Sequence, residues 1–165
     1  MDLGSVTPLL LTYNEEANLE RTLGQLTWAE RIVVVDSYST DATIDILEQV
    51  PRAEVFQREF DAHTPQWNYG LSRVETEWVL SLDADYVLSD RLIEEMDSIE
   101  PVSSINGYRA EFTYRVFGVP LRGSLYPPRR VLFRHDTAIY LLGRHAHRLD
   151  VHGEAAPAHG TIYHD

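Results

Sequence analysis

Short, largely apolar runs recur along the first hundred residues and are separated by polar segments. Runs of this kind predict strands that are buried on both faces, as in a parallel sheet. Each run ends where polar residues begin, which indicates a loop at that end. The predicted strands cover residues 6–11, 32–35, 53–56 and 78–82.

The segments between these runs show the spacing and the start signals of helices. Asn14 offers an N-cap, and Glu15 and Glu16 would stand in the first helical turn, where the helix dipole favours acidic side chains. A second helix is expected to start at residues 39–41, a third at Pro65 and a fourth after the cap Ser89. The apolar faces would consist of Leu19, Leu23 and Leu26; Ile44 and Leu47; Trp67 and Leu71; and Leu92, Ile93 and Met96.

Alternating strands and helices predict an α/β fold with a mainly parallel sheet and helices on both of its faces. Ligands of such sheets bind beyond the carboxyl ends of the strands. Tyr13, Asp36 and Asp83 follow three of these ends, so three polar loops should converge at one edge. After Pro101 the pattern changes, and residues 108–114 and 129–134 read as strands of a smaller C-terminal region.

Composition narrows the choice of chemistry. The 165 residues include no cysteine, and all 14 basic residues are arginine, so thiol chemistry, a Walker-type lysine and a Schiff base are excluded. Residues 1–105 carry a net charge of −15 and residues 106–165 a net charge of +3. An acidic first half argues against nucleic-acid binding. No signal peptide or membrane span is visible, so we expect a cytoplasmic protein with at most peripheral membrane contact.

The triplet Asp83-Ala84-Asp85 directly follows an apolar strand at the expected ligand edge. With 12 aspartates in the chain, about one Asp-x-Asp triplet is expected by chance, so only its position carries information. Two neighbouring carboxylates repel each other unless a cation or a hydrogen-bonded ligand lies between them. A hard divalent cation would suit these oxygens and would also neutralise a diphosphate in a chain without lysine.

Three segments together resemble the family 2 glycosyltransferases with the GT-A fold: Leu-Thr-Tyr-Asn-Glu-Glu at 11–16, Val-Val-Asp-Ser-Tyr-Ser-Thr-Asp-Ala-Thr at 34–43, and Trp-Val-Leu-Ser-Leu-Asp-Ala-Asp at 78–85. The likeness is strongest to the bacterial branch that adds sugars to the lipopolysaccharide core or to related cell-surface glycans. The resemblance implies one Rossmann-like GT-A domain over residues 1–165. Residues 1–100 would bind the nucleotide sugar, and residues 101–165 would form the acceptor side and complete the metal site.

The same resemblance implies roles for individual residues. Asp36 would hydrogen-bond the base, Asp83 would contact the ribose or the metal, and Tyr13 would lie against the base. Asp85 would bind Mg²⁺ or Mn²⁺ at the diphosphate, and His164 would complete that metal site. The further nucleotide-binding candidates are Thr12, Asn14, Glu15, Arg58 and Asn68.

The sequence does not decide which residue is the catalytic base or whether the arginines of residues 129–134 bind an anion. His147, Asp150 and Glu154 are the base candidates, and each could equally be a solvated loop residue. Arg129, Arg130 and Arg134 would face the donor diphosphate or an anionic acceptor, or else lie exposed on a strand.

The leading hypothesis is a metal-dependent, inverting glycosyltransferase that moves a sugar from a nucleotide-diphosphate sugar, with a UDP-sugar favoured, to a glycan or glycolipid hydroxyl. One alternative is a non-catalytic or truncated nucleotide-sugar-binding module. Another is a nucleotidyltransferase, which usually needs a glycine-rich, basic phosphate loop; the sequence shows none.

Overall fold

A computed structural model of the chain describes residues 1–116, 118–121, 127–142 and 147–164, without the side chains of residues 142, 147 and 148. The helices are α1 (Leu19–Gly24), α2 (Thr43–Glu48), α3 (His63–Leu71) and α4 (Asp90–Ser98), with 3₁₀ turns at Leu3–Ser5 and His135–Thr137. The strands are β1 (Val6–Thr12), β2 (Ile32–Asp36), β3 (Ala53–Gln57), β4 (Trp78–Asp83), β5 (Tyr86–Leu88), β6 (Ile105–Val116), β7 (Val119–Pro120), β8 (Arg129–Arg134), β9 (Ala138–Leu142), β10 (His147–Val151) and β11 (Glu154–His164).

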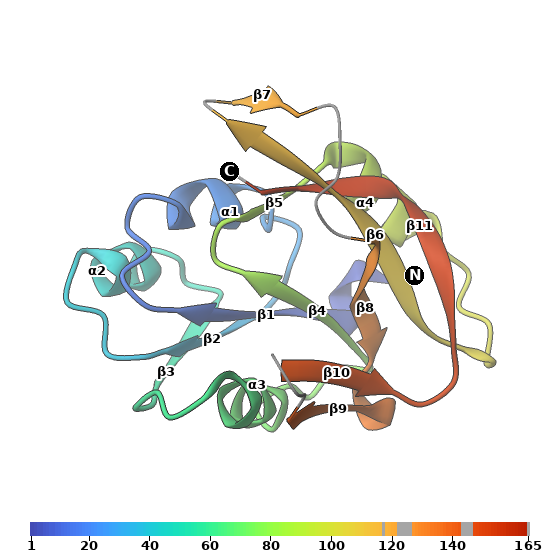
Figure 1. Ribbon diagram of the computed structural model, residues 1–165, viewed down its shortest axis with the longest axis horizontal. Coiled ribbons are helices and arrows are strands. Elements are labelled where there is room, and N and C mark those ends of the chain that lie inside the picture. The colour runs from blue at the N-terminus through green and yellow to red at the C-terminus, as the bar shows by residue number, and fades with distance from the viewer. Residues whose placement is uncertain (117, 122–126, 143–146, 165) are drawn as a thin grey trace.

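One curled mixed sheet organises the fold (Figure 1). Its described strands run in the order β3-β2-β1-β4-β8-β6-β11-β5, and β7 pairs with β6 outside this path. The first four strands are mutually parallel. Beyond them, β8 is antiparallel to both β4 and β6, whereas β6 and β11 are parallel. Strands from both halves of the chain therefore share one sheet.

Two apolar layers cover the two faces of this sheet. On one face α1, α2 and α4 bury Leu23, Leu47 and Met96 against residues such as Leu10 and Val34. On the other face α3 and the β9–β10 hairpin bury Trp67 and Tyr140 against Leu9, Val33 and Val35. The rings of Trp67 and Tyr140 stack with centroids 5.2 Å apart. The predicted α/β class, with helices on both faces, is confirmed.

The first predicted helix start is wrong. Helix α1 begins at Leu19 with Asn18 at the N-cap position, whereas Asn14 has a positive φ of 56°. The backbone N–H groups of Asn14 and Glu15 donate instead to the hydroxyls of Ser39 and Thr43. A contact between two loops thus holds the segment after β1 out of the helix. For the same reason α2 starts only at Thr43.

The sequence pattern missed the strands that complete the C-terminal region. The largest omission is β11, which lies between β6 and β5 and pairs with both. Strand β5 directly follows the Asp83-Ala84-Asp85 turn, so its pairing with β11 brings the end of β11 beside that turn. Among the described residues no helix combines the length and the apolar character needed to span a membrane.

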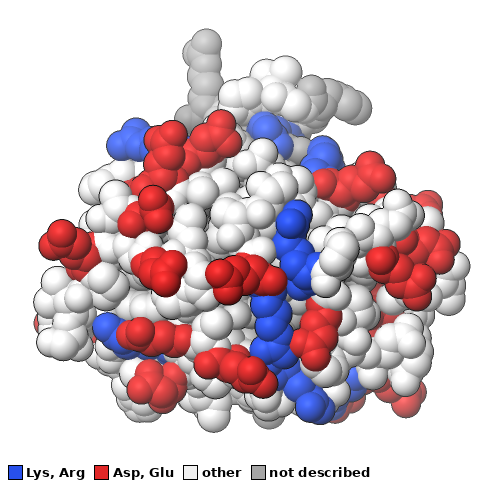
Figure 2. Space-filling model, turned by 180° about the vertical axis from the view of Figure 1, so that it is seen from behind, with Lys and Arg blue, Asp and Glu red and all other residues white. Residues whose placement is uncertain are grey.

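Surface charge on the face seen from behind is interleaved (Figure 2). A stripe of arginine crosses the middle of this face, and acidic side chains are scattered on either side of it. Acidic residues dominate the first part of the sequence and arginines the second, but on this surface the two kinds of charge lie side by side.

Candidate functional site

A cleft of about 870 Å³ opens at the carboxyl ends of β1, β2, β3 and β4. Parallel strands place their carboxyl ends at the same edge, which is where α/β sheets bind ligands. The cleft collects five of the predicted site residues, Thr12, Tyr13, Glu15, Asp83 and Asp85. The rest of its lining consists of Leu11, Ser37, Glu59, Phe60, His63 and Ala84.

The described lining of this cleft carries four carboxylates, one histidine and no arginine. Burial raises the pKa of the Glu15 carboxyl above its ordinary value, and repulsion from Asp85, Asp83 and Asp41 acts in the same direction. Crowded acidic groups of this kind repel an anionic ligand. A diphosphate could therefore bind beside Glu15, Asp83 and Asp85 only if a cation neutralised part of this negative charge.

The predicted pair Asp85 and His164 meets at one side of the cleft. Antiparallel pairing of β11 with β5 sets His164 opposite Tyr86, and His164 Nε2 lies 3.0 Å from Asp85 Oδ2. Burial raises the pKa of the Asp85 carboxyl, the attraction of His164 opposes this rise and the repulsion of Asp83 adds to it. The His164 ring is held between Tyr86 and Tyr114, at centroid distances of 5.3 Å and 4.6 Å.

These two side chains fit a divalent cation in part. One carboxylate and one imidazole nitrogen suit Mn²⁺, and a carboxylate suits Mg²⁺. Nδ1 of His164 is buried and has no hydrogen-bond partner among the described residues. Within the described ranges no cluster of three or more acidic or histidine side chains is arranged to hold a metal alone. The donor set would therefore be completed by ligand oxygens, as Mg²⁺ sites often are by phosphates.

Asp83 lies at the end of β4, near the hydroxyl of Tyr86. Burial and the nearby Asp83 raise the pKa of Tyr86, so this phenol stays protonated and acts as a donor. The turn between β4 and β5 is itself anchored, because Thr22 of α1 donates to the backbone oxygen of Ala84 over 2.7 Å. The geometry fixes Asp83 and Asp85 at the rim of the cleft.

Asp36 and Asn14 brace the loops instead of lining the cleft. Asp36 is fully buried, and its carboxylate accepts hydrogen bonds from Thr12 Oγ1 at 2.9 Å and from the backbone N–H of Ser39 at 2.9 Å. The Asn14 side chain accepts one from the Thr40 N–H at 2.8 Å. A bond from a nucleotide base to Asp36 stays a prediction and would require Asp36 to become accessible.

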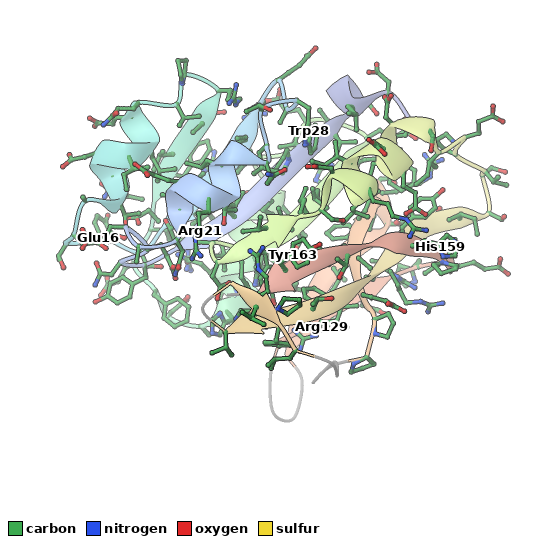
Figure 3. All side chains as sticks on the ribbon, turned by 90° about the horizontal axis from the view of Figure 1, so that it is seen from above. Glu16, Arg21, Trp28, Arg129, His159 and Tyr163 are labelled. Atoms are coloured by element: carbon green, nitrogen blue, oxygen red, sulfur yellow. The ribbon has the colours of Figure 1, made fainter. Side chains whose placement is uncertain are left out.

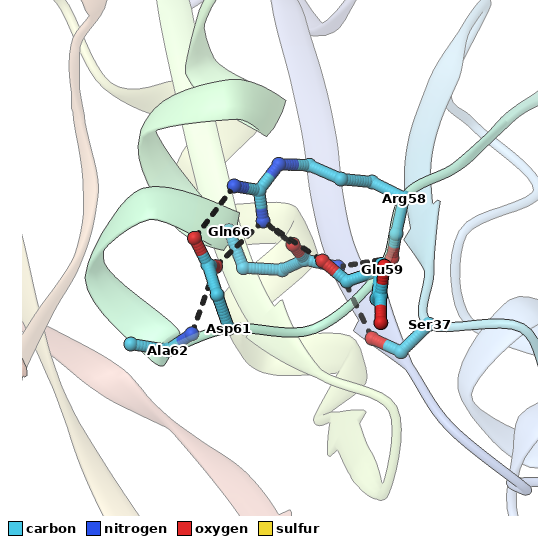
Figure 4. Close-up of polar contacts among 6 residues, drawn as sticks. All are labelled: Ser37, Arg58, Glu59, Asp61, Ala62 and Gln66. Atoms are coloured by element: carbon cyan, nitrogen blue, oxygen red, sulfur yellow. Dashed lines mark hydrogen bonds and ion pairs between the residues drawn. The ribbon is translucent and has the colours of Figure 1, made fainter.

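Two further nucleotide-binding candidates are occupied by internal contacts. Arg58 forms an ion pair with Asp61, with Nη1 and Oδ1 2.8 Å apart (Figure 4). The Asn68 amide both donates to the backbone oxygen of Tyr140 and accepts from its N–H, each at 2.9 Å. Asn68 therefore fastens α3 to β9, and neither residue is in the described lining of the cleft.

The three arginines of β8 have different surroundings. Arg134 pairs with Glu77, and its guanidinium lies 4.7 Å above the ring of Trp78, at the end of β4 remote from Asp83. Arg130 donates to the backbone oxygen of Val151 over 2.8 Å. Arg129 is exposed, close enough to act on Tyr86, and Figure 3 shows it on the β6 and β11 side of the molecule, away from Glu16. Only Arg129 is brought near the acidic turn.

The three candidates for the catalytic base lie in different places and do not form one group. The side chain of His147, the first residue of β10, lies outside the described residues. Asp150 is half-buried in β10, opposite Ile139. Glu154 starts β11 and His164 ends it, so the two are roughly 30 Å apart at the usual rise of a strand. Glu154 is therefore remote from the Asp85–His164 pair.

Sequence reasoning missed the wall formed by Ser37, Glu59, Phe60 and His63. These residues follow β2 and β3, and the strand-end rule that selected Tyr13 and Asp83 could have selected them too. It also missed Tyr140, whose hydroxyl lies 2.6 Å from Ser81 Oγ. No local signal marks that contact, because the two residues are 59 positions apart.

Comparisons with known proteins bear on the family and the fold. A family model described as glycosyl transferase family 2 matches residues 9–112. An uncharacterized glycosyltransferase of Rickettsia bellii (strain RML369-C) is 32% identical over 95 residues, which are 57% of this chain and 32% of that protein. The SPbeta prophage-derived glycosyltransferase SunS of Bacillus subtilis (strain 168) is 25% identical over 158 residues, 87% of this chain and 34% of SunS. The chain thus spans about a third of the length of these relatives.

Solved structures agree on the fold. The structure of residues 1–349 of S. aureus TarS in complex with UDP-GlcNAc superposes with a TM-score of 0.61 at 22% identity, covering 74% of this chain and 36% of TarS. The corresponding complex with UDP gives a TM-score of 0.53. The GT-A-like fold and the family resemblance predicted from the sequence are confirmed. Since the family model covers well over half of its residues, the chain belongs to glycosyl transferase family 2.

Proposed function

We propose that this chain binds a nucleotide-diphosphate sugar, with a UDP-sugar as the favoured donor, and transfers the sugar to a glycan or glycolipid hydroxyl with inversion. The observation that carries the proposal is the cleft in which Thr12, Tyr13, Asp83 and Asp85 converge at one sheet edge. Membership of the family and the ligands of the TarS structures, UDP-GlcNAc and UDP, support this choice of donor.

Two adjoining parts of the cleft suit the two parts of such a donor. Tyr13 comes from the β1 end and is 59% exposed, which leaves its ring free to contact a flat base. Asp83 and Asp85 lie at the β4 end beside His164, where the diphosphate would lie. A bound Mg²⁺ or Mn²⁺, held by Asp85 and His164, would neutralise the charge that develops on the departing diphosphate.

The remaining chemistry is a proton transfer and an in-line displacement. A base removes the proton of the acceptor hydroxyl as its oxygen attacks the anomeric carbon, and the bond to the nucleoside diphosphate breaks on the opposite side. His147 and Asp150 remain the candidates for this base. Arg129, whose charge acts on Tyr86, would stabilise negative charge near the acidic turn.

Calorimetry of UDP binding with and without Mn²⁺ tests the donor site. We expect binding that depends on Mn²⁺ in the unsubstituted chain and is weakened at least tenfold in Asp85→Asn, since a carboxylate ligand is lost. Asp97→Asn, which removes an exposed carboxylate on α4, is the matched control and should bind as the parent does. Absence of UDP binding, or Mn²⁺-dependent binding retained in Asp85→Asn, would contradict the proposal.

Donor hydrolysis and transfer separate an enzyme from a binding module. Release of sugar from UDP-sugars in the presence of Mn²⁺ is the expected result, and the anomeric configuration of a transferred sugar reports on inversion. UDP binding without either reaction would favour the alternative of a nucleotide-sugar-binding module.

A further inference from the structure

Phe60 is an exposed aromatic side chain in a cleft that is otherwise rich in polar groups. It keeps 47% of its surface accessible although it lines the cleft. Its ring packs edge-on against His63, with centroids 5.1 Å apart and an interplanar angle of 75°. This contact leaves a face of the ring available, and exposed apolar surface inside a cleft is typical of a ligand-binding site.

A set of polar contacts fixes the segment that carries Phe60 (Figure 4). Arg58 binds Asp61 with both terminal nitrogens, at 2.8 and 3.0 Å, and also donates to the side-chain oxygen of Gln66. Gln66 is fully buried and donates to the backbone oxygen of Arg58 at 3.2 Å and to Ser37 Oγ at 3.1 Å. We call these contacts among Ser37, Arg58, Asp61 and Gln66 the clasp.

The clasp ties the segment after β3 to the loop after β2 on both sides of Phe60. Arg58 and Asp61 flank Phe60 in sequence, and Gln66 belongs to α3, which packs against the sheet. A polar group as fully buried as the Gln66 amide stays in place only if it is hydrogen-bonded. The ring of Phe60 is therefore held at the wall of the cleft by the strands and by α3.

The order of the strands assigns this wall to one end of the cleft. β3 is three strands away from β4 in the sheet, which amounts to roughly 14 Å at the usual strand spacing. Asp83 and Asp85 occupy the β4 end. Phe60 follows the end of β3 by three residues, so it reaches the cleft from the side opposite to that of Asp83 and Asp85, where the nucleoside part of a donor would lie.

We propose that Phe60 is a stacking surface for the base of the donor nucleotide and that the clasp residues Arg58, Asp61 and Gln66 position it. This inference rests on the proposed donor site. It assigns Arg58 a positioning role in place of the direct nucleotide contact expected from the sequence. Tyr13 and Phe60, from β1 and from the segment after β3, then contact the same base.

Binding of UDP and of inorganic pyrophosphate, each with Mn²⁺, tests the inference, because pyrophosphate has the phosphates but no base. Stacking of a base on an aromatic side chain is typically lost at a cost of roughly 5- to 150-fold in affinity. Phe60→Ala should lose UDP affinity within that range while its pyrophosphate affinity stays unchanged. Phe60→Tyr should restore UDP binding, since it keeps an aromatic face.

Tyr38→Ala is the matched control, because Tyr38 is 54% exposed and outside the described lining of the cleft. It should bind UDP like the parent chain. Unchanged UDP affinity in Phe60→Ala, or an equal loss of pyrophosphate affinity, would overturn the inference and leave the donor site standing. Failure of the unsubstituted chain to bind UDP would instead overturn the proposed function, and the inference with it.

Discussion

Single side chains near the cleft act mainly by joining segments that are distant in sequence. Asp36 accepts from both Thr12 and Ser39, and Asn68 holds the backbone of Tyr140 at two points. A hydrogen bond contributes little net stability, but an unmet buried donor or acceptor costs about 1–3 kcal/mol. Removing one of these side chains should therefore cost more than the small net contribution of the hydrogen bond itself.

Asn68→Ala tests this at the contact between α3 and β9. The substitution leaves the N–H and the oxygen of Tyr140, a residue only 4% exposed, without the Asn68 amide. We expect the free energy of unfolding, measured in urea, to fall by about 1–3 kcal/mol. Gln49→Ala, which removes an exposed amide bonded to the Asp45 oxygen, should stay within about 0.5 kcal/mol of the parent. A loss no larger than that of this control would contradict the role given to Asn68.

The clasp also predicts a pH dependence. The hydrogen bonds from Arg58 and from the Ala62 N–H lower the pKa of Asp61 from 3.8 to about 2. A carboxyl whose pKa is lower in the folded state stabilises the fold above its unfolded pKa, and this stabilisation disappears as the pH falls through the folded pKa.

Thermal unfolding of the parent and of Asp61→Asn, followed from pH 7 down to pH 2, measures the contribution. Asp61→Asn should melt lower than the parent at pH 7 by a small, constant margin that shrinks below about pH 4. The margin is small because Asp61 is exposed and solvent screens its ion pair. A margin that does not change with pH would show that the carboxylate charge is irrelevant to the clasp.

At the scale of elements, β11 packs closely against α4. This contact helps to fix β11, whose last residue, His164, lies beside the cleft. The Glu95 carboxylate of α4 accepts hydrogen bonds from the N–H groups of His159 and Gly160, the latter at 2.9 Å. A Cβ atom at Gly160 would lie 2.4 Å from the Cα of Leu92. The position thus requires glycine because the two backbones touch.

Gly160→Ala should accordingly push β11 away from α4 and lower the free energy of unfolding by about 1–3 kcal/mol. Gly24→Ala is the matched control, because a Cβ atom there meets nothing within 4 Å and Gly24 ends helix α1. That substitution should be neutral or stabilising by up to about 1 kcal/mol. Urea unfolding of both variants gives the comparison, and equal stabilities would refute the close-packing argument.

Strands made of an unbroken apolar run could be predicted from the sequence. Strands that form only because they pair with residues distant in the sequence could not. β1, β2 and β4 are buried along their length, so their patterns reveal them. β11 contains Pro157 and Gly160 and alternates poorly, because its residues face a bulged partner and a helix. The position of Asp83 and Asp85 at the cleft could be predicted because a strand precedes them directly. The remote position of Glu154 could not be predicted, because β11 itself was not predicted. It is the direction of β11 that brings His164, at its end, to the cleft and leaves Glu154, at its start, far from it.

At the scale of the whole molecule, the two halves of the chain depend on one another. β4 pairs with β8, and the core around Leu80 includes Tyr108, Phe112, Leu132 and Ile162 from the second half. Burying one such side chain contributes about 1.5–3 kcal/mol, and domains are stable by only about 5–15 kcal/mol. The loss of several of them would exceed the whole stability of the fold.

A chain that ends at residue 104 tests this dependence. It retains the three segments 11–16, 34–43 and 78–85 but lacks β6, β8 and β11. We expect it to show no cooperative thermal transition in near-ultraviolet circular dichroism and to expose apolar surface to a dye. Cooperative unfolding together with UDP binding equal to that of the 165-residue chain would contradict the expectation.

The pairing of β5 with β11 joins the two parts of the proposed phosphate end of the cleft. β5 has three residues and stands at the edge of the sheet, and it holds β11 through the pairs at Leu88, Val87 and Tyr86. Local opening of such a short edge strand costs less than global unfolding. It would part Asp85 from His164 while Tyr13 and Phe60 keep their places on other segments. Amide exchange at whichever of Tyr163 and His164 donates to β5 would then report the fraction of molecules in which β5 and β11 are paired.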